Sequence, residues 1–182
     1  TKRLSGTSDW YTYHKDLNSG TNPAYNFIKL NSDAAEIVNA SSNGSIWNST
    51  SPSSTVINIG TSLSGNGDEY IAYAFHSVSG YSKIGSYTGT GSSGNAQSIG
   101  FQPDFVMIKS KAQYNWNMYD TKRPSGSITG RYMLLANATD AEYTTSAVHI
   151  DITSTGFSFP NGYDGTNKSS QEYIYMAFKI VS

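Results

Sequence analysis

The sequence predicts an all-β protein, and three observations support that prediction. The 182 residues include 17 glycines and 14 tyrosines, together with many Ser, Thr and Asn, which form turns and strands more readily than helices. No stretch of ten or more residues free of Gly and Pro carries the apolar stripe of an amphipathic helix. Two segments, EYIAYAF at 69–75 and EYIYMAF at 172–178, alternate with a period of two, as strands do.

Those two segments also belong to an internal repeat. Five residues of the first half recur 106 positions later: Trp10, Tyr13, Asn31, Ala35 and Glu36 match Trp116, Tyr119, Asn137, Ala141 and Glu142. The alternating segment recurs after 103 positions, so the intervening loops differ slightly in length. The sequence therefore predicts two divergent tandem copies, residues 1–78 and 79–182. The stretch 79–111 opens the second copy and has no counterpart in the first.

The strands of the first copy are expected where apolar residues alternate between turn formers. DWYTYH at 9–14 alternates as a half-buried strand does, and a short apolar run follows at 27–30. VINI at 56–59 places two apolar side chains on one face, as GFSF does at 156–159 in the second copy. Small residues on the second face of 69–75 suit the middle of a β-sandwich. We therefore expect an antiparallel β-sandwich.

The opening of the second copy predicts two further strands. Lys83–Tyr87 forms the first, and the Gly-rich stretch 88–98 is expected to be a loop or long hairpin. Pro103 cannot donate to a ladder, so the next strand should begin near Asp104. Both faces of 104–109 are apolar, which predicts an inner strand paired on both edges.

Composition excludes several classes of partner. The net charge is −1 and charged residues make up 14% of the chain, so no basic surface for nucleic acid is expected. No apolar run approaches the roughly 20 residues that a membrane helix requires. The chain has no cysteine and thus neither disulfides nor thiolate metal sites. Because it begins Thr-Lys-Arg without Met, we expect a fragment or a processed piece.

The sequence predicts no catalytic residue, no metal site and no cofactor. Its histidines, His14, His76 and His149, show no metal-ligand spacing, and no nucleophile or phosphate-binding motif is present. Neighbouring carboxylates, such as Asp68 and Glu69, do not by themselves indicate the facing pair that glycoside hydrolysis needs. DGTN at 164–167 offers oxygens as a calcium loop does, but too few.

Aromatic residues in loops are the remaining candidates for binding. A flat ring can stack on the apolar face of a sugar. Five rings lie in loop-rich contexts and are the predicted carbohydrate-binding residues: Trp47, Tyr81, Tyr87, Tyr114 and Tyr163. Trp47 lies within the Ser- and Asn-rich segment 39–54. The alternative is that each ring packs over its own loop. The tryptophans at 10 and 116 occupy one repeat position and are expected in cores.

Several motifs, in fixed order, resemble a repeat domain of bacteriophage tail and virion proteins, marine phages above all. They are SDWYTYHKDL, LNSDAAE, WNSTSPSSTVINIG, EYIAYAF, GYSKIGSYTGTGS and GFQPDFVMIK, and together they cover essentially the whole chain. The resemblance implies a concanavalin-like or jelly-roll β-sandwich in a phage structural or receptor-binding protein. It brings no catalytic residues.

From these observations we expect a non-enzymatic virion module, located on the virion and outside the cell. As part of a tail fibre or adhesin it would contact cell-surface glycan or neighbouring virion proteins. A carbohydrate-active enzyme of sandwich fold and a purely architectural spacer are the alternatives. Because the first copy lacks an opening stretch, a homo-oligomer is expected, with a trimer as the first guess from the resemblance. Tyr11 and Tyr13 would contribute to its contacts.

Overall fold

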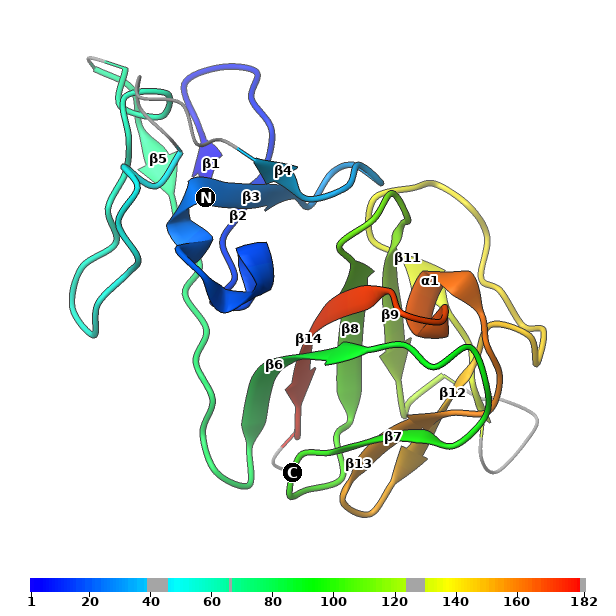
Figure 1. Ribbon diagram of the computed structural model, residues 1–182. Helices are drawn as coiled ribbons and strands as arrows, with labels where there is room; N and C mark the ends of the chain where they lie inside the picture. Colours follow the sequence, from blue (N-terminus) through cyan, green and yellow to red (C-terminus); the bar gives the residue numbers. More distant parts are fainter. Residues whose placement is uncertain (39–45, 66, 124–129, 181–182) are drawn as a thin grey trace. The chain divides into compact units, whose positions relative to one another are not determined.

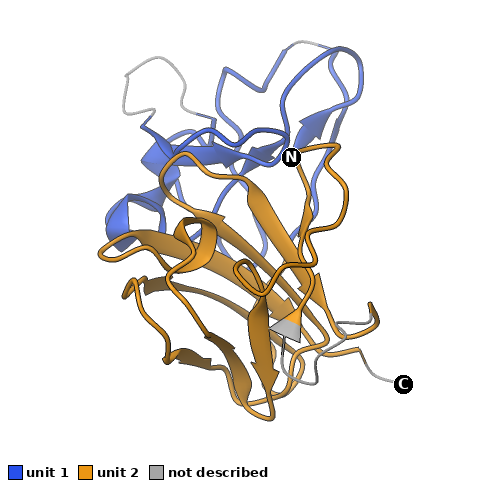
Figure 2. Ribbon diagram, turned by 90° about the vertical axis from the view of Figure 1, so that its right-hand side faces the viewer, with its two compact units in different colours: residues 1–74 blue, residues 75–182 orange. Residues whose placement is uncertain are grey.

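The computed structural model describes residues 1–38, 46–65, 67–123 and 130–180. The chain divides into two compact units, residues 1–74 and 75–182 (Figure 2). The boundary thus falls four residues before the one expected from the repeat. Nearly all regular structure is β, and the strands pair antiparallel throughout the described ladders. The all-β prediction is confirmed.

The second unit is a sandwich of two sheets (Figure 1). One sheet has the order β11-β9-β8-β14-β6 and the other the order β10-β12-β13-β7. A single α-helical turn among the described residues, α1 (Asp164–Asn167), precedes the last strand. The strands are β6 (Ser82–Thr88), β7 (Asn95–Ser98), β8 (Phe105–Ser110), β9 (Trp116–Asp120), β10 (Gly130–Arg131), β11 (Leu134–Leu135), β12 (Ile150–Thr153), β13 (Gly156–Phe159) and β14 (Glu172–Phe178).

Side chains from both sheets form the core of the second unit. The aromatic rings of Tyr87, Tyr173 and Tyr175 from one sheet meet Phe157 and Phe159 from the other. Aliphatic side chains of β8, including Val106 and Ile108, are fully buried beside them. Alternation along the strands therefore directs one face of each sheet into a shared apolar layer.

The inner-strand prediction for 104–109 is confirmed. β8 pairs with β9 on one edge and with β14 on the other, and Figure 1 shows it between them. Val106 and Met107 are both buried, on opposite faces of the strand. Phe105 is only half-buried, since it begins the strand.

The first unit contains shorter strands. β1 (Lys2–Arg3) pairs with β5 (Tyr70–Ile71), and β3 (Asn26–Lys29) lies between β2 (Tyr11–Thr12) and β4 (Ile37–Val38). Two 3₁₀ turns, η1 (Leu17–Gly20) and η2 (Pro23–Tyr25), lead into β3. The core consists of Ala24, Phe27, Ile46, Trp47 and Leu63.

Two ladders of the first unit have the register of ladders in the second. Tyr11 pairs with Lys29 and Thr12 with Ile28, as Asn117 pairs with Leu135 and Met118 with Leu134, 106 residues later. The β1–β5 ladder pairs Arg3 with Tyr70, and β8–β14 pairs Ser110 with Tyr173. Here the offsets are 107 and 103 residues. One loop residue thus separates the two offsets before and after the first turn.

Other corresponding positions differ between the units. Ile57 is 40% exposed, whereas Phe157 is 1% exposed within β13. The strand expected at 56–59 is absent from the described structure, so that prediction is wrong. Phe75 and Phe178 contact each other within the second unit (5.6 Å between ring centroids), so they do not occupy matching places. A strand forms only where partner strands accept its hydrogen bonds.

Candidate functional site

The first unit contains a hollow of about 160 Å³. Its lining combines two aromatic rings, one guanidinium and several hydroxyl groups: Arg3, Thr7, Ser8, Tyr11, Ser62, Leu63 and Tyr70. We call this group of residues the Arg3 hollow. It offers room for one small polar molecule, since a water molecule takes about 30 Å³ in the liquid.

Pairing of distant segments creates the Arg3 hollow. Arg3 of β1 lies opposite Tyr70 of β5 in the ladder. The turn after β1 then returns the chain to β2, whose Tyr11 exchanges backbone hydrogen bonds with Thr1. Tyr11 also packs edge-on against Phe27 in the core, with ring centroids 5.4 Å apart. The tyrosine rings are therefore held by strands rather than by loops.

Polar contacts fix the guanidinium of Arg3. Its Nη1 lies 3.3 Å from Oδ2 of Asp68, and its Nη2 donates to the carbonyl of Thr7 over 3.0 Å. The hydroxyl of Ser5 donates to Oδ1 of Asp68 over 2.6 Å. That hydrogen bond, with Arg3 and Tyr70 beside it, lowers the pKa of Asp68. Asp68 is thus held as a carboxylate that orients Arg3.

One nitrogen of this guanidinium has capacity left. Nε of Arg3 is buried and has no hydrogen-bond partner among the described residues. Hydroxyl groups of Thr7, Ser8 and Ser62 line the same hollow. Hydroxyls both donate and accept, while the guanidinium only donates. This arrangement can bind a polyhydroxylated or anionic small molecule, and it places no nucleophile beside a general base.

Two of the five predicted binding rings are buried. Trp47 is 3% exposed in the core of the first unit, edge-on to Tyr13. Tyr87 is 9% exposed, and the rings of Tyr173 and Phe159 both stack against it at 5.0 Å. Neither ring has a free face for a sugar, so the expectation of exposed loop rings is wrong for both. Burial of apolar ring area outweighs the polarity of the flanking sequence.

The other three predicted rings lie at or near the surface. Tyr81 is exposed just before β6. Tyr114 and Tyr163, both half-buried, flank helix α1. The hydroxyl of Tyr114 donates to Asp164 over 2.9 Å, and Nζ of Lys168 lies 3.0 Å from the same carboxylate and 6.0 Å from the centre of the Tyr114 ring. We call Tyr114, Tyr163, Asp164 and Lys168 the α1 cluster.

The acidic side chains considered for catalysis have structural partners. Glu36 accepts hydrogen bonds from the backbone of Asn18 and the side chain of Asn26. Glu142 forms an ion pair with Arg123 at 2.8 Å. In the DGTN segment, Oδ1 of Asn167 accepts from the backbone of Thr90 over 3.0 Å. These contacts orient loops, and within the described residues no group of three His, Asp or Glu could hold a metal ion.

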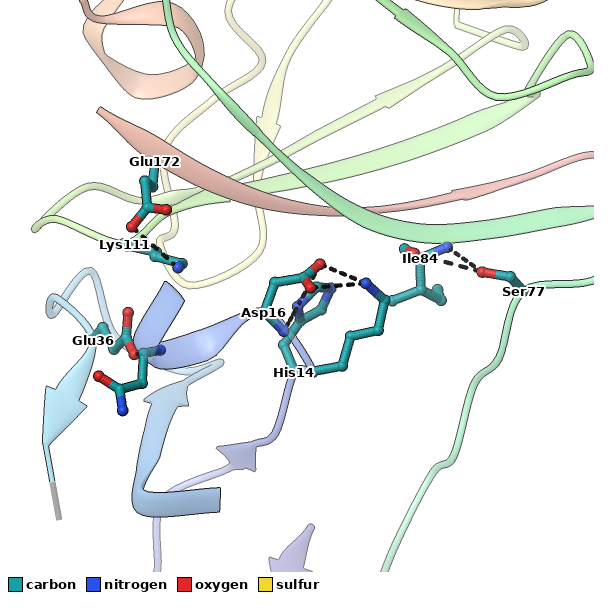
Figure 3. Close-up of polar contacts among 9 residues, drawn as sticks. His14, Asp16, Glu36, Ser77, Ile84, Lys111 and Glu172 are labelled. Atoms are coloured by element: carbon teal, nitrogen blue, oxygen red, sulfur yellow. Dashed lines mark hydrogen bonds and ion pairs between the residues drawn. The ribbon is translucent and has the colours of Figure 1, made fainter. Parts of the chain in front are cut away.

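Polar contacts drawn in Figure 3 are of the same structural kind. In the first unit, Nδ1 of His14 accepts the backbone N–H of Asp16 over 3.1 Å. In the second unit, buried Lys111 forms an ion pair with Glu172 at 3.2 Å, and the hydroxyl of Ser77 accepts the backbone N–H of Ile84 over 3.0 Å. Each contact joins a loop to a strand or a turn. No helix in the described part of the chain is long and apolar enough to cross a membrane.

A family described as a domain of unknown function, DUF7483, matches residues 1–180. The chain belongs to the DUF7483 family. The matched range of this DUF7483 chain runs through both units, including the Arg3 hollow and the α1 cluster. No curated protein and no solved structure matches it.

The Arg3 hollow is not visible in the sequence. Residues Arg3 and Tyr70 are separated by more than 60 positions, and neither belongs to a recognised motif. A signal existed only for the ladder: the recurrence of EYIAYAF predicted that 69–75 would pair like 172–178. Extending that argument to Thr1–Leu4 would have placed Arg3 and Tyr70 opposite each other.

Proposed function

We propose that this chain is a non-enzymatic binding module of a phage virion, part of a tail fibre or receptor-binding protein, which contacts host-surface glycan. The observation that carries the proposal is the Arg3 hollow, in which tyrosine rings and hydroxyl groups surround an oriented guanidinium. Sugars are bound by such combinations of aromatic faces and hydrogen-bonding groups. The resemblance to phage tail and virion repeat domains supplies the setting, on the virion and outside the cell.

We further propose that the two units are divergent tandem copies of one jelly-roll-like β-sandwich. Support comes from the identical registers of β2–β3 and β9–β11, and of β1–β5 and β8–β14. The bridge between Met133 and Tyr143 adds a third case, since Phe27 and Ile37 pair at the corresponding positions. Chance would not align three ladders at nearly constant offsets.

A glycan array probed with the 182-residue chain tests the binding proposal. We expect saturable binding to a subset of glycans, without release of hydrolysis products. Arg3→Gln should reduce that binding at least tenfold, because it removes the charge that faces the ligand. The matched control is Tyr114→Phe in the α1 cluster, which should leave binding unchanged.

Each other outcome of the array is informative. Hydrolysis products would overturn the non-enzymatic proposal and favour a carbohydrate-active enzyme. Binding that is lost in Tyr114→Phe but not in Arg3→Gln would move the site to the α1 cluster. No binding to any glycan would contradict glycan recognition and favour contact with neighbouring virion proteins or an architectural spacer.

Assembly as a homo-oligomer, with a trimer as the first expectation, is part of the same proposal. A symmetric assembly lets each subunit cover its neighbour's exposed strand edges. Tyr11 and Tyr13 are half-buried against Phe27 and Trp47, so only their outer edges would be available for contacts. Light scattering should give a multiple of the 19.7 kDa chain mass, and a monomer at high concentration would contradict the assembly.

A further inference from the structure

The segments 69–75 and 172–178 have nearly the same sequence and different surroundings. In the second unit, all seven residues form β14, which pairs with β8 on one edge and β6 on the other. In the first unit, only Tyr70 and Ile71 form a strand, and β1 is the partner of β5 in the described sheet. Residues 72–74 are exposed, with Tyr73 at 63%.

Backbone direction shows which edge of β5 is open. The N–H of Leu4 donates to the carbonyl of Glu69, so Glu69 and Ile71 face β1. Alternation then turns the backbone groups of Tyr70, Ala72 and Ala74 to the opposite edge. Among the described residues, no backbone hydrogen bond involves 72–74.

The matching edge of β14 is occupied. Lys111 donates to Glu172 on the β8 side, as Leu4 donates to Glu69. On the other side, the carbonyls of Gln171 and Tyr81 accept from Gly89 and Lys179 where β6 begins and ends. The residues of β14 that face β6 are therefore Tyr173, Tyr175 and Ala177, which correspond to Tyr70, Ala72 and Ala74. All three are buried.

We propose that the open edge of β5 is a docking site for an extended segment with the chemistry of β6, which completes the first sheet as β6 completes the second. Such a segment alternates small or polar residues with Ile and Tyr, as Ser82–Thr88 does. It would bind antiparallel, by strand addition. The β14–β6 register predicts the pairing: residues equivalent to Gly85 and Lys83 would lie opposite Ala72 and Ala74.

The occupant is limited to a β6-like strand. In the second unit, the chain continues from β6 into β7, which pairs with β13. A Cβ on Gly156 of β13 would lie 1.9 Å from the carbonyl oxygen of Gln97. The first unit has Val56 at the corresponding position, so the β7 ladder cannot be repeated there in the same form.

A self-complemented chain tests the proposal. The sequence of Ser79–Gly89 is placed ahead of Thr1 through a Gly/Ser linker of about 15 residues, whose average reach of roughly 20 Å is sufficient. The gap to be spanned is about 14 Å, from two inter-strand spacings and the rise of three residues. Hydrogen exchange of residues 69–75 is compared with that of the 182-residue chain.

We expect exchange at Tyr70, Ala72 and Ala74 to slow at least tenfold in the extended chain. Two variants of the added strand separate pairing from nonspecific effects. Gly85→Pro removes an N–H that would face β5 and should abolish the protection. Ser86→Pro removes an N–H that faces away, as a proline on an edge strand can, and should retain it.

Three results would overturn the proposal. Unchanged exchange in the extended chain would mean that the edge does not accept a β6-like strand. Equal protection with both proline variants would show that ladder bonding is not involved. Strong protection in the 182-residue chain, together with a dimer in light scattering, would assign the edge to a second copy. None of these results depends on whether the Arg3 hollow binds glycan, since the array measures that separately.

Discussion

Oδ1 of Asn137 accepts the backbone N–H of Trp116 over 2.7 Å. The same side-chain amide donates through Nδ2 to Oδ1 of Asn115, also over 2.7 Å. One asparagine thereby joins the start of β9 to the end of β11. In the first unit, Asn31 accepts the N–H of Trp10 over 2.8 Å and donates to Asp9 over 3.0 Å, at corresponding positions.

Asn137→Ala should therefore destabilise the second unit by about 1–3 kcal/mol, because the N–H of Trp116 loses its acceptor in a partly buried place. Asn31→Ala, at an exposed site, should lower stability by less than about 1 kcal/mol, because water replaces the lost partner. Urea denaturation followed by hydrogen exchange in β2 and β9 measures each unit separately. Equal losses at both sites would contradict this explanation.

Val106→Asp should prevent the second unit from folding. Val106 is fully buried in the inner strand β8, where a carboxylate would have neither water nor a partner. Phe105→Asp should have a smaller effect, about 1–3 kcal/mol, because Phe105 is half-buried at the start of the strand. Circular dichroism and thermal unfolding report the outcome. Cooperative unfolding of Val106→Asp at the unmodified temperature would place β8 outside the core.

Alkaline pH should destabilise the second unit. Burial raises the pKa values of Tyr87, Tyr119 and Tyr173 above that of an exposed tyrosine. Above pH of about 10, the unfolded chain loses these protons while the folded chain retains them. The stability is thus fully present below pH 10 and falls above it, by about 1.4 kcal/mol per pH unit for each tyrosine.

Urea denaturation at several pH values between 8 and about 12 tests this dependence. Tyr87→Phe removes one of the three groups and should reduce the slope by about one third. It also removes the hydrogen bond to the carbonyl of Thr166 (2.6 Å), so its stability at neutral pH should fall by about 1–2 kcal/mol. An unchanged slope would show that Tyr87 titrates equally in both states.

Gly156→Ala should destabilise the second unit by about 2–3 kcal/mol. The added Cβ would meet the carbonyl oxygen of Gln97, and β7 and β13 would have to separate. Val56→Ala provides a control at the corresponding position of the first unit, which is exposed, and should change stability by less than about 0.5 kcal/mol. Thermal unfolding of both variants is the measurement. A neutral Gly156→Ala would mean that β7 is not held against β13.

The sequence by itself determined the all-β class, the inner position of residues 104–109 and the recurrence that anticipates the shared registers. These features follow from local composition and periodicity, which every strand carries in its own residues. Only the tertiary structure decided the fates of EYIAYAF and EYIYMAF, because a strand's length depends on the edges that neighbouring strands offer. It also buried Trp47 and Tyr87 and brought Arg3 to Tyr70. Such contacts join residues distant in sequence, so no local pattern encodes them.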